Sequence, residues 1–160
     1  MFLENQDAIG LIPFIRENQQ QFYRLAFSYV RDSETAMDLV QDAIVKAIQN
    51  MHTLRQPDRL KTWFYRILVN ECLMYLRKNR KLLPIQSLEQ ELAAPEQGNQ
   101  DLHEAISQLP PHLRTIILLR FFEDMKLEEI ARITRTNLST VKSRLYKALK
   151  LLRLEMEDKP

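Results

Sequence analysis

The chain has 160 residues, of which 45% are hydrophobic and 28% charged, and its formal net charge at pH 7 is +2. This length holds one ordinary domain or two small ones, with enough apolar residues for a core. No apolar run approaches the roughly 18 residues of a membrane span, and the first residues lack the layout of a signal peptide. We therefore expect no membrane insertion and a cytoplasmic location, which suits a single cysteine, Cys72.

Glycine is scarce, with only Gly10 and Gly98 in the whole chain. This excludes the Gly-rich loops that hold phosphates in P-loop and dinucleotide-binding proteins. It also disfavours a turn-rich all-β fold. We therefore predict an all-α protein, built as two small helical domains on a flexible linker.

Three helices are predicted in the first half of the chain, over about residues 13–30, 33–51 and 59–80. Asp32 and Asp58 stand where the second and third helices need N-caps. Apolar residues at helical spacing predict the inward faces: Phe22, Leu25, Ala26, Tyr29 and Val30, then Val40, Ile44, Ala47, Ile48 and Met51, then Leu60, Phe64, Ile67, Leu68, Tyr75 and Leu76.

These helices would form a first domain, residues 10–84, which Pro84 closes. Residues 85–99 are acidic, polar and rich in glutamine, and they are predicted to be a flexible linker. The second domain, residues 100–156, would begin with a short helix over 101–108. A helix from the Pro110-Pro111 pair to about residue 122 would follow it.

The last third of the chain predicts a helix-turn-helix, with a short helix from Leu127 and a long one from Leu138 to about residue 155. Ala131 and Val141 are spaced as residues at a helix crossing, where a small side chain is needed. The predicted inward residues are Ile130 and Ala131 on the first helix and Leu138, Val141, Leu145 and Leu149 on the second.

The small net charge hides two basic blocks, residues 53–81 and 130–154. The segment between them, residues 87–113, carries acids and neither lysine nor arginine. Two separated basic blocks indicate two separate contacts with a polyanion such as nucleic acid.

The second basic block includes a candidate recognition helix that begins after Asn137, a good N-cap whose position leaves backbone N–H groups free for a phosphate. Lys142 can donate to guanine, and Tyr146 can pack on a thymine methyl group. The alternative is an ordinary amphipathic helix with a solvated basic face. The predicted outward residues are Ser139, Thr140, Lys142, Ser143, Tyr146 and Lys147.

The first basic block interleaves aromatic and cationic residues, a pattern that suits unstacked bases of a single strand. Phe64 is better explained as core, whereas Trp63 fits a core position and a nucleic-acid contact equally well. The residues concerned are Arg59, Lys61, Trp63, Phe64, Tyr65 and Arg66.

A polar stripe, Asp38, Gln41 and Asp42, lies on one side of the second helix and could pair with arginines of a partner; a merely solvated face is the alternative. The histidines are scattered, and no metal-ligand spacing is present. We therefore expect no enzyme, cofactor or metal. A nuclease built from Glu123, Asp124, Glu128 and Glu129 and a stand-alone helix-turn-helix repressor remain the alternatives.

Five segments in this order resemble the extracytoplasmic-function (group IV) sigma factors of bacterial RNA polymerase, in the sigma-70 family. They are FYRLAFSYVRD (22–32), AMDLVQDAIVKA (36–47), KTWFYRILVNECL (61–73), LPPHLRTIILLRFFE (109–123) and TVKSRLYKA (140–148). The resemblance implies a three- or four-helix sigma region 2 domain, a linker and a helix-turn-helix region 4 domain. It also implies a factor that binds core RNA polymerase and directs promoter-specific initiation, of a stress or envelope-response regulon.

The resemblance also implies residue roles. The segment with Asp38, Leu39, Gln41 and Asp42 would grip the coiled coil of the polymerase beta-prime subunit, with the beta subunit as a further contact. Arg59, Lys61, Trp63, Arg66 and Asn70 would belong to the surface that opens and reads the minus-ten element as a single strand.

In the second domain, the recognition-helix residues named above would read the minus-thirty-five element as duplex. An anti-sigma protein, often membrane-anchored, is the implied regulator. Family turns often have glycine where this chain has Arg135, so the resemblance predicts a positive φ without glycine or a reshaped turn there.

Overall fold

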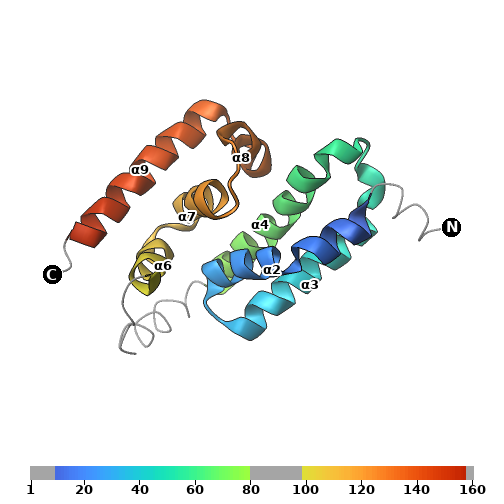
Figure 1. Ribbon diagram of the computed structural model, residues 1–160, viewed down its shortest axis with the longest axis horizontal. Coiled ribbons are helices and arrows are strands. Elements are labelled where there is room, and N and C mark those ends of the chain that lie inside the picture. Colours follow the sequence, from blue (N-terminus) through green and yellow to red (C-terminus); the bar gives the residue numbers. More distant parts are fainter. Residues whose placement is uncertain (1–9, 80–98, 158–160) are drawn as a thin grey trace. The chain divides into compact units, whose positions relative to one another are not determined.

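The computed structural model describes residues 10–79 and 99–157, and none of these residues lies in a strand (Figure 1). They form two compact units, one built by α2, α3 and most of α4, the other by the helices from α6 onward. Within the described ranges, no helix combines the length and apolar character needed to cross a membrane. The all-α, two-domain prediction is confirmed. The predicted linker lies outside the described residues, except for Asn99, which begins α6.

The three predicted helices form as α2 (Leu11–Val30), α3 (Ser33–Gln49) and α4 (Leu60–Asn79), and the first unit takes α4 as far as Cys72. Two short 3-10 turns, η1 (Met51–Thr53) and η2 (Pro57–Arg59), connect α3 to α4. Asp58, predicted as an N-cap, lies inside η2 instead. Leu60 already has helical backbone angles, so the turn leads directly into α4 without a separate cap.

Asp32 caps α3 as predicted. Its carboxylate accepts hydrogen bonds from the backbone N–H of Thr35, at 3.0 Å, and from the Thr35 hydroxyl, at 2.6 Å. The hydroxyl and then the backbone bond lower the pKa of Asp32. The preceding residue, Arg31, takes a left-handed conformation (φ 56°) that ends α2 and lets the chain reverse.

The core between α2 and α3 is built from small residues. Ala26 on α2 and Ala36, Ala43 and Ala47 on α3 are fully buried, which lets the two backbones approach closely. The predicted inward face of α3 was therefore partly wrong: Leu39 and Ala43 are buried, whereas Ile44 is only half-buried. Alanine is only weakly hydrophobic, so the spacing of hydrophobic residues in the sequence does not show that α3 is turned with its alanines inward.

Large aromatic rings attach α4 to α2. Phe22 lies 4.5 Å from Phe64 between ring centroids and 5.5 Å from Tyr65, and Phe14 lies 5.8 Å from Phe64. Edge and tilted ring pairs of this kind add to the free energy gained by burying the rings. Phe64 is core, as predicted, and Tyr65 joins it.

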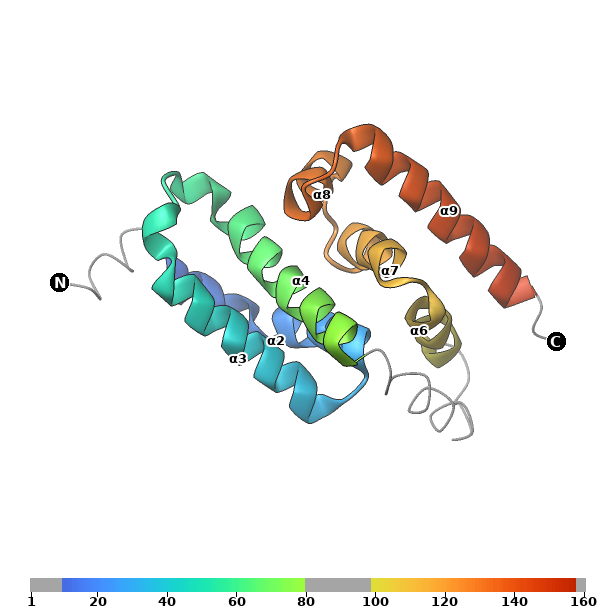
Figure 2. The same cartoon turned by 180° about the vertical axis from the view of Figure 1, so that it is seen from behind.

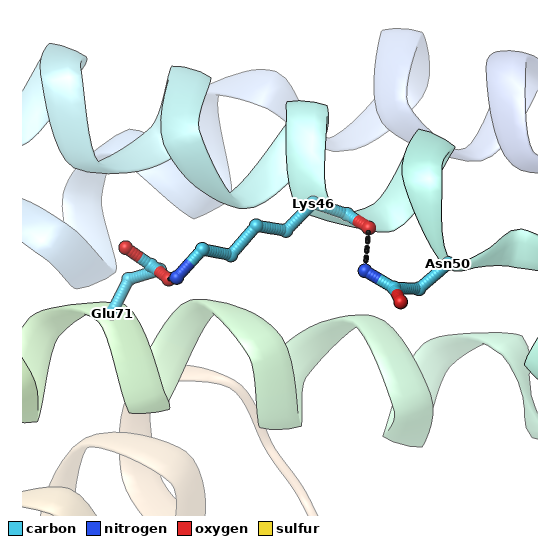
Figure 3. A network of polar contacts seen from close by, with 3 residues as sticks. All are labelled: Lys46, Asn50 and Glu71. Carbon is cyan, nitrogen blue, oxygen red and sulfur yellow. Dashed lines mark hydrogen bonds and ion pairs between the residues drawn. The ribbon is translucent and has the colours of Figure 1, made fainter.

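An ion pair joins α3 to α4 (Figure 3). The ammonium group of Lys46 contacts the carboxylate of Glu71, whose side chain is only 11% exposed. The Lys46 backbone carbonyl also accepts a hydrogen bond from the Asn50 amide, at 2.8 Å, at the end of α3. Lys46 thus supplies the counter-charge that a mostly buried carboxylate needs.

The second unit contains α6 (Asn99–Gln108), α7 (Pro111–Ile117), a π-helical segment η3 (Leu118–Phe122), α8 (Leu127–Thr134) and α9 (Leu138–Glu157). Buried Arg114 ties α6 to α7, because its guanidinium donates to the carbonyls of Ser107 and Leu109 at 2.7 and 3.0 Å. The core residues of this unit include Leu113, Ile116, Ile117, Leu119, Met125, Ile130 and Val141.

The helix-turn-helix forms as predicted, with α8 and α9 joined through Arg135. This residue has φ 56° and ψ 42°, so the positive φ without glycine occurs, and its N–H bonds the Ala131 carbonyl. On α9, Val141 is buried as predicted, but Leu149 is 39% exposed and Ala148 is buried instead. Ala148 lies seven residues after Val141, which keeps it nearer the same side of a straight helix than a residue eight positions on.

Glycine at position 135 should stabilise the second unit. Arg135→Gly removes the steric cost of a left-handed conformation and should raise the free energy of unfolding by about 0.5–1 kcal/mol. Lys150→Gly, in the exposed middle of α9, should lower it by about 1 kcal/mol. Calorimetry of the full chain checks both. The only tryptophan, Trp63, lies in the first unit, so its fluorescence identifies that unit's transition. A decrease for Arg135→Gly would contradict the argument.

Removing Lys46 should destabilise the first unit. Lys46→Met leaves the Glu71 carboxylate buried without its counter-charge and should cost about 1–2 kcal/mol, a range that allows for water reaching half-exposed Lys46. The double variant Lys46→Met/Glu71→Leu should lose less than the sum of the single variants. Urea unfolding followed by Trp63 fluorescence measures the cycle, and simple additivity would show that the pair is not coupled.

Candidate nucleic-acid interfaces

The outward face of α9 is polar and basic. Ser139, Lys142, Ser143 and Lys147 are exposed, and Tyr146 has 69% of its surface free. Thr140 is half-buried at the first turn, where its N–H donates to the Asn137 side chain at 2.7 Å. Asn137 is thus the N-cap, as predicted, but it occupies this N–H, which is therefore not free for a phosphate. The structure brings the six predicted residues to the first half of one helix.

The buried side of α9 determines which residues point outward. Val141 and Ala148 are fully buried and Leu152 nearly so. Since 3.6 residues make one turn, Ser139, Ser143 and Tyr146 fall on the opposite side. This row of two hydroxyls and a phenol, with Lys142 beside it, can offer hydrogen-bond donors to base edges in a major groove.

A second candidate surface lies on α4. Trp63, Arg66 and Asn70 follow one another at helical spacing and so share one side of this helix. Arg59, Lys61 and Asn70 are exposed, whereas Trp63 and Arg66 are half-buried. The five predicted residues therefore lie on α4 and on the turn that leads into it.

Trp63 is neither core nor free. Its indole N–H donates to the Thr53 hydroxyl at 3.3 Å, and that hydroxyl donates to the Asn50 carbonyl at 2.7 Å. The ring is thereby held against η1 while part of it stays in reach of solvent. No sequence pattern indicated Thr53, because its contact with Trp63 depends on how η1 folds.

A third surface lies on α3. Asp38, Gln41 and Asp42 are exposed on the side opposite the alanines, together with two apolar residues, Met37 and Val45. Leu39 differs from its predicted neighbours, because only 6% of it is exposed and it packs into the core. The polar stripe is therefore surface, and Leu39 holds the helix in place from the other side.

Cys72 is fully buried. Burial, with the nearby charge of Glu71 as a second cause, raises the pKa of the thiol far above its usual range. The thiolate is the reactive form of cysteine. Cys72 is thus a core residue rather than a reactive one.

The acids at the start of α8 have a structural place. Glu128 and Glu129 lie in the first turn, where negative charge is favoured, and the Glu129 carboxylate accepts a hydrogen bond from the Lys126 N–H at 3.3 Å.

His103 lies against the ring of Phe122, at 5.4 Å between centroids. Within the described part of the chain, no three metal-ligating side chains gather at one point.

Two family models match the chain. Residues 14–82 match sigma-70 region 2, and residues 99–152 match sigma-70 region 4. The first match covers most of α2 and all of α3 and α4, and the second covers α6 through most of α9.

Two relatives and one solved structure resemble the chain over most of its length. RNA polymerase sigma factor SigV of Bacillus subtilis is 47% identical over 150 residues, which are 91% of this chain and 90% of that protein. The ECF RNA polymerase sigma-E factor of Escherichia coli is 30% identical, covering 90% of this chain and 84% of the relative.

The solved structure is the sigma factor RpoE of Bartonella quintana, crystallised with the anti-sigma factor NepR. It matches with a TM-score of 0.71 at 24% identity, over 92% of this chain and 99% of that chain. This likeness bears on the fold alone. The two region matches and the relatives establish that the chain belongs to the extracytoplasmic-function group of the sigma-70 family, RNA polymerase sigma factors that direct transcription initiation at promoters.

Proposed function

We propose that three exposed surfaces of this sigma factor divide its work. The stripe on α3 binds core RNA polymerase, the α4 surface opens the minus-ten element, and α9 reads the minus-thirty-five element. The observation that carries the proposal is that the polar residues of all three surfaces are exposed or half-buried while each helix buries its opposite side. A polypeptide with this role acts by binding and is not itself an enzyme.

The polymerase contact is assigned to Asp38, Gln41 and Asp42. Two carboxylates and an amide in register can accept and donate hydrogen bonds along a partner helix that carries arginines, and charged pairs of this kind are strong and directional. The expected partner is the coiled coil of the beta-prime subunit. The beta subunit is a further expected contact within core polymerase.

The minus-ten contact is assigned to Arg59, Lys61, Trp63, Arg66 and Asn70. Trp63 is held by Thr53 at 3.3 Å with part of its ring accessible, so a base can stack on it without first ordering the side chain. The cations attract the strand's phosphates, and Asn70 can hydrogen-bond a base edge. Capture of unstacked bases stabilises the open promoter without ATP.

The minus-thirty-five contact is assigned to α9. Ser139, Ser143 and Tyr146 face outward, and Lys142 lies beside them; Lys147 lies nearer the edge of the helix. The first group reads base edges and Lys147 contacts the backbone. The regulator is an anti-sigma protein, often membrane-anchored in this family, and the site of action is the cytoplasm. The genes served belong to a stress or envelope response.

A gel shift with promoter duplex, with and without core polymerase, tests the function as a whole. In the gel shift, the chain should give specific complexes only together with core enzyme. In a transcription assay, mapping of start sites should likewise show new ones only when both are present. Tight specific binding by the chain alone would instead indicate a stand-alone repressor.

Reversing one charge of the α3 stripe should abolish polymerase association. Asp42→Lys places a cation where the partner's arginines are expected, and like charges at an interface cost several kcal/mol. Glu17→Lys, an equal charge change at an exposed position of α2, should bind as the parent does. Pull-down of core polymerase measures both, with circular dichroism to verify folding. Unchanged binding by Asp42→Lys would remove the α3 stripe from the interface.

Lys142→Ala should weaken minus-thirty-five binding selectively. A lysine that donates to guanine contributes about 1–3 kcal/mol, which is lost only where the guanine is present. Arg153→Ala, further along the exposed side of α9, should weaken binding evenly across sequences. Promoter binding by holoenzyme across single-base variants compares the two. An even loss for Lys142→Ala would make it a phosphate contact.

A further inference from the structure

A chain of hydrogen bonds runs through the connection between α3 and α4 and reaches Trp63. The two helices meet at one end of the first unit, where η1 and η2 join them (Figures 1 and 2). Met51, the first residue of η1, is buried, and its carbonyl accepts a hydrogen bond from the Leu54 N–H at 3.1 Å. The turn that contacts Trp63 is therefore fastened to the core.

Asn50 connects η1 to the last turn of α3. Its backbone N–H and its side-chain amide both donate to the Lys46 carbonyl, at 3.0 and 2.8 Å, and Figure 3 shows the second of these bonds. Its own carbonyl accepts from the backbone N–H and from the hydroxyl of Thr53, at 2.9 and 2.7 Å. Two hydrogen bonds on each side of Asn50 thus tie Thr53 to α3.

The bond between Thr53 and Trp63 can run in one direction only. An indole N–H is a donor, so the Thr53 hydroxyl, 3.3 Å away, accepts from it. A hydroxyl has one proton to donate, and that of Thr53 goes to the Asn50 carbonyl, which leaves its lone pairs for the indole. Among other side chains of this size, only serine offers a hydroxyl that can both donate and accept in this way.

We infer that Thr53 is a positioning residue for Trp63, which fixes the indole ring to the end of α3, the helix proposed to bind core polymerase. The inference rests on the proposed function, in which the ring stacks on a base of the minus-ten strand. The polar stripe of α3 ends at Asp42, about one turn before Lys46. The polymerase contact and the ring are thus attached to one helix, and the ring is already ordered when the strand arrives.

Removal of the Thr53 hydroxyl without a change of shape tests this role. Thr53→Val keeps the branched side chain but cannot accept from the indole, so Trp63 has to be ordered when it binds a base. Holoenzyme assembled from this variant and core polymerase should form open complexes with an affinity about threefold to tenfold lower, the scale of ordering one side chain. Thr53→Ser, which keeps the hydroxyl, should match the parent.

Permanganate reactivity of the unpaired thymines, followed against holoenzyme concentration, measures open-complex formation. Pull-down measures association with core polymerase, which should be equal for the parent, Thr53→Val and Thr53→Ser. A change that merely weakened the fold of the first unit would reduce both quantities together.

Trp63 supplies a second readout, because it is the only tryptophan of the chain. In Thr53→Val its fluorescence anisotropy should fall and its quenching by acrylamide should rise, whereas Thr53→Ser should change neither. Ser28→Ala removes a hydroxyl that donates to the Arg24 carbonyl within α2 at 2.9 Å. This control should leave both the fluorescence and promoter opening as in the parent.

The double variant Thr53→Val/Trp63→Ala separates positioning from a direct contact with DNA. If Thr53 acts through Trp63, the loss of its hydroxyl adds nothing once the ring is gone. A further decrease in the double variant, relative to Trp63→Ala, would overturn the inference, because Thr53 would then act on the promoter by itself. Parent-like opening by Thr53→Val, or a Thr53→Ser variant as weak as Thr53→Val, would overturn it as well.

The single variant Trp63→Ala distinguishes this failure from a failure of the proposed function. If Trp63→Ala opens promoters as the parent does, the ring captures no base and the proposed minus-ten contact is wrong at this residue. If Trp63→Ala is weakened while Thr53→Val is not, the base contact stands and only the positioning role of Thr53 is lost.

Discussion

The first unit depends on the packing of the Phe22 ring against Phe64, 4.5 Å away. This contact and the neighbouring Tyr65 fix how α4 is rotated about its own axis. Because the rings take the inner side, Trp63 and Asn70 are left on or near the surface, and the Lys46–Glu71 pair fixes the same helix against α3. The surface proposed to meet a single strand is thus a consequence of core packing on the other side of the helix.

In the second unit, too, core packing sets the rotation of the functional helix, but the buried residues are smaller. Burial of Val141 and Ala148 sets the rotation of α9, and Arg135 sets its direction relative to α8 by taking a left-handed conformation. Once these are set, the hydroxyls and Tyr146 point outward, and the basic residues are divided between the face and the flanks. The residues proposed for base contacts and those proposed for phosphate contacts are therefore separated by angle around one helix, an arrangement in which a single element can provide both position and specificity.

The surfaces on α3, α4 and α9 differ in the sign of their charge. The α3 stripe is acidic and carries apolar Met37 and Val45, a combination suited to a protein partner. The α4 and α9 surfaces are cationic and carry Trp63 and Tyr146, aromatic groups that suit bases. The surfaces proposed for a protein partner and for a polyanion thus lie on different helices of a chain of nearly neutral net charge, so the two proposed partners do not compete for one patch.

The sequence by itself determined the helical class, both units and the caps at Asp32 and Asn137, because these follow from local chemistry: the spacing of apolar residues and side-chain hydrogen bonds. At Arg135 it left a positive φ and a reshaped turn open, and the structure has the positive φ. The segments that resemble a family determined the function. Only the tertiary structure decided which side of α3 and α9 is buried: Leu39, predicted to contact the polymerase, is buried, and Leu149, predicted to lie in the core, is 39% exposed. It alone brought Thr53, in η1, to Trp63, on α4. Such a contact joins residues on different elements, and it depends on how alanines and aromatic rings pack, which no local pattern records.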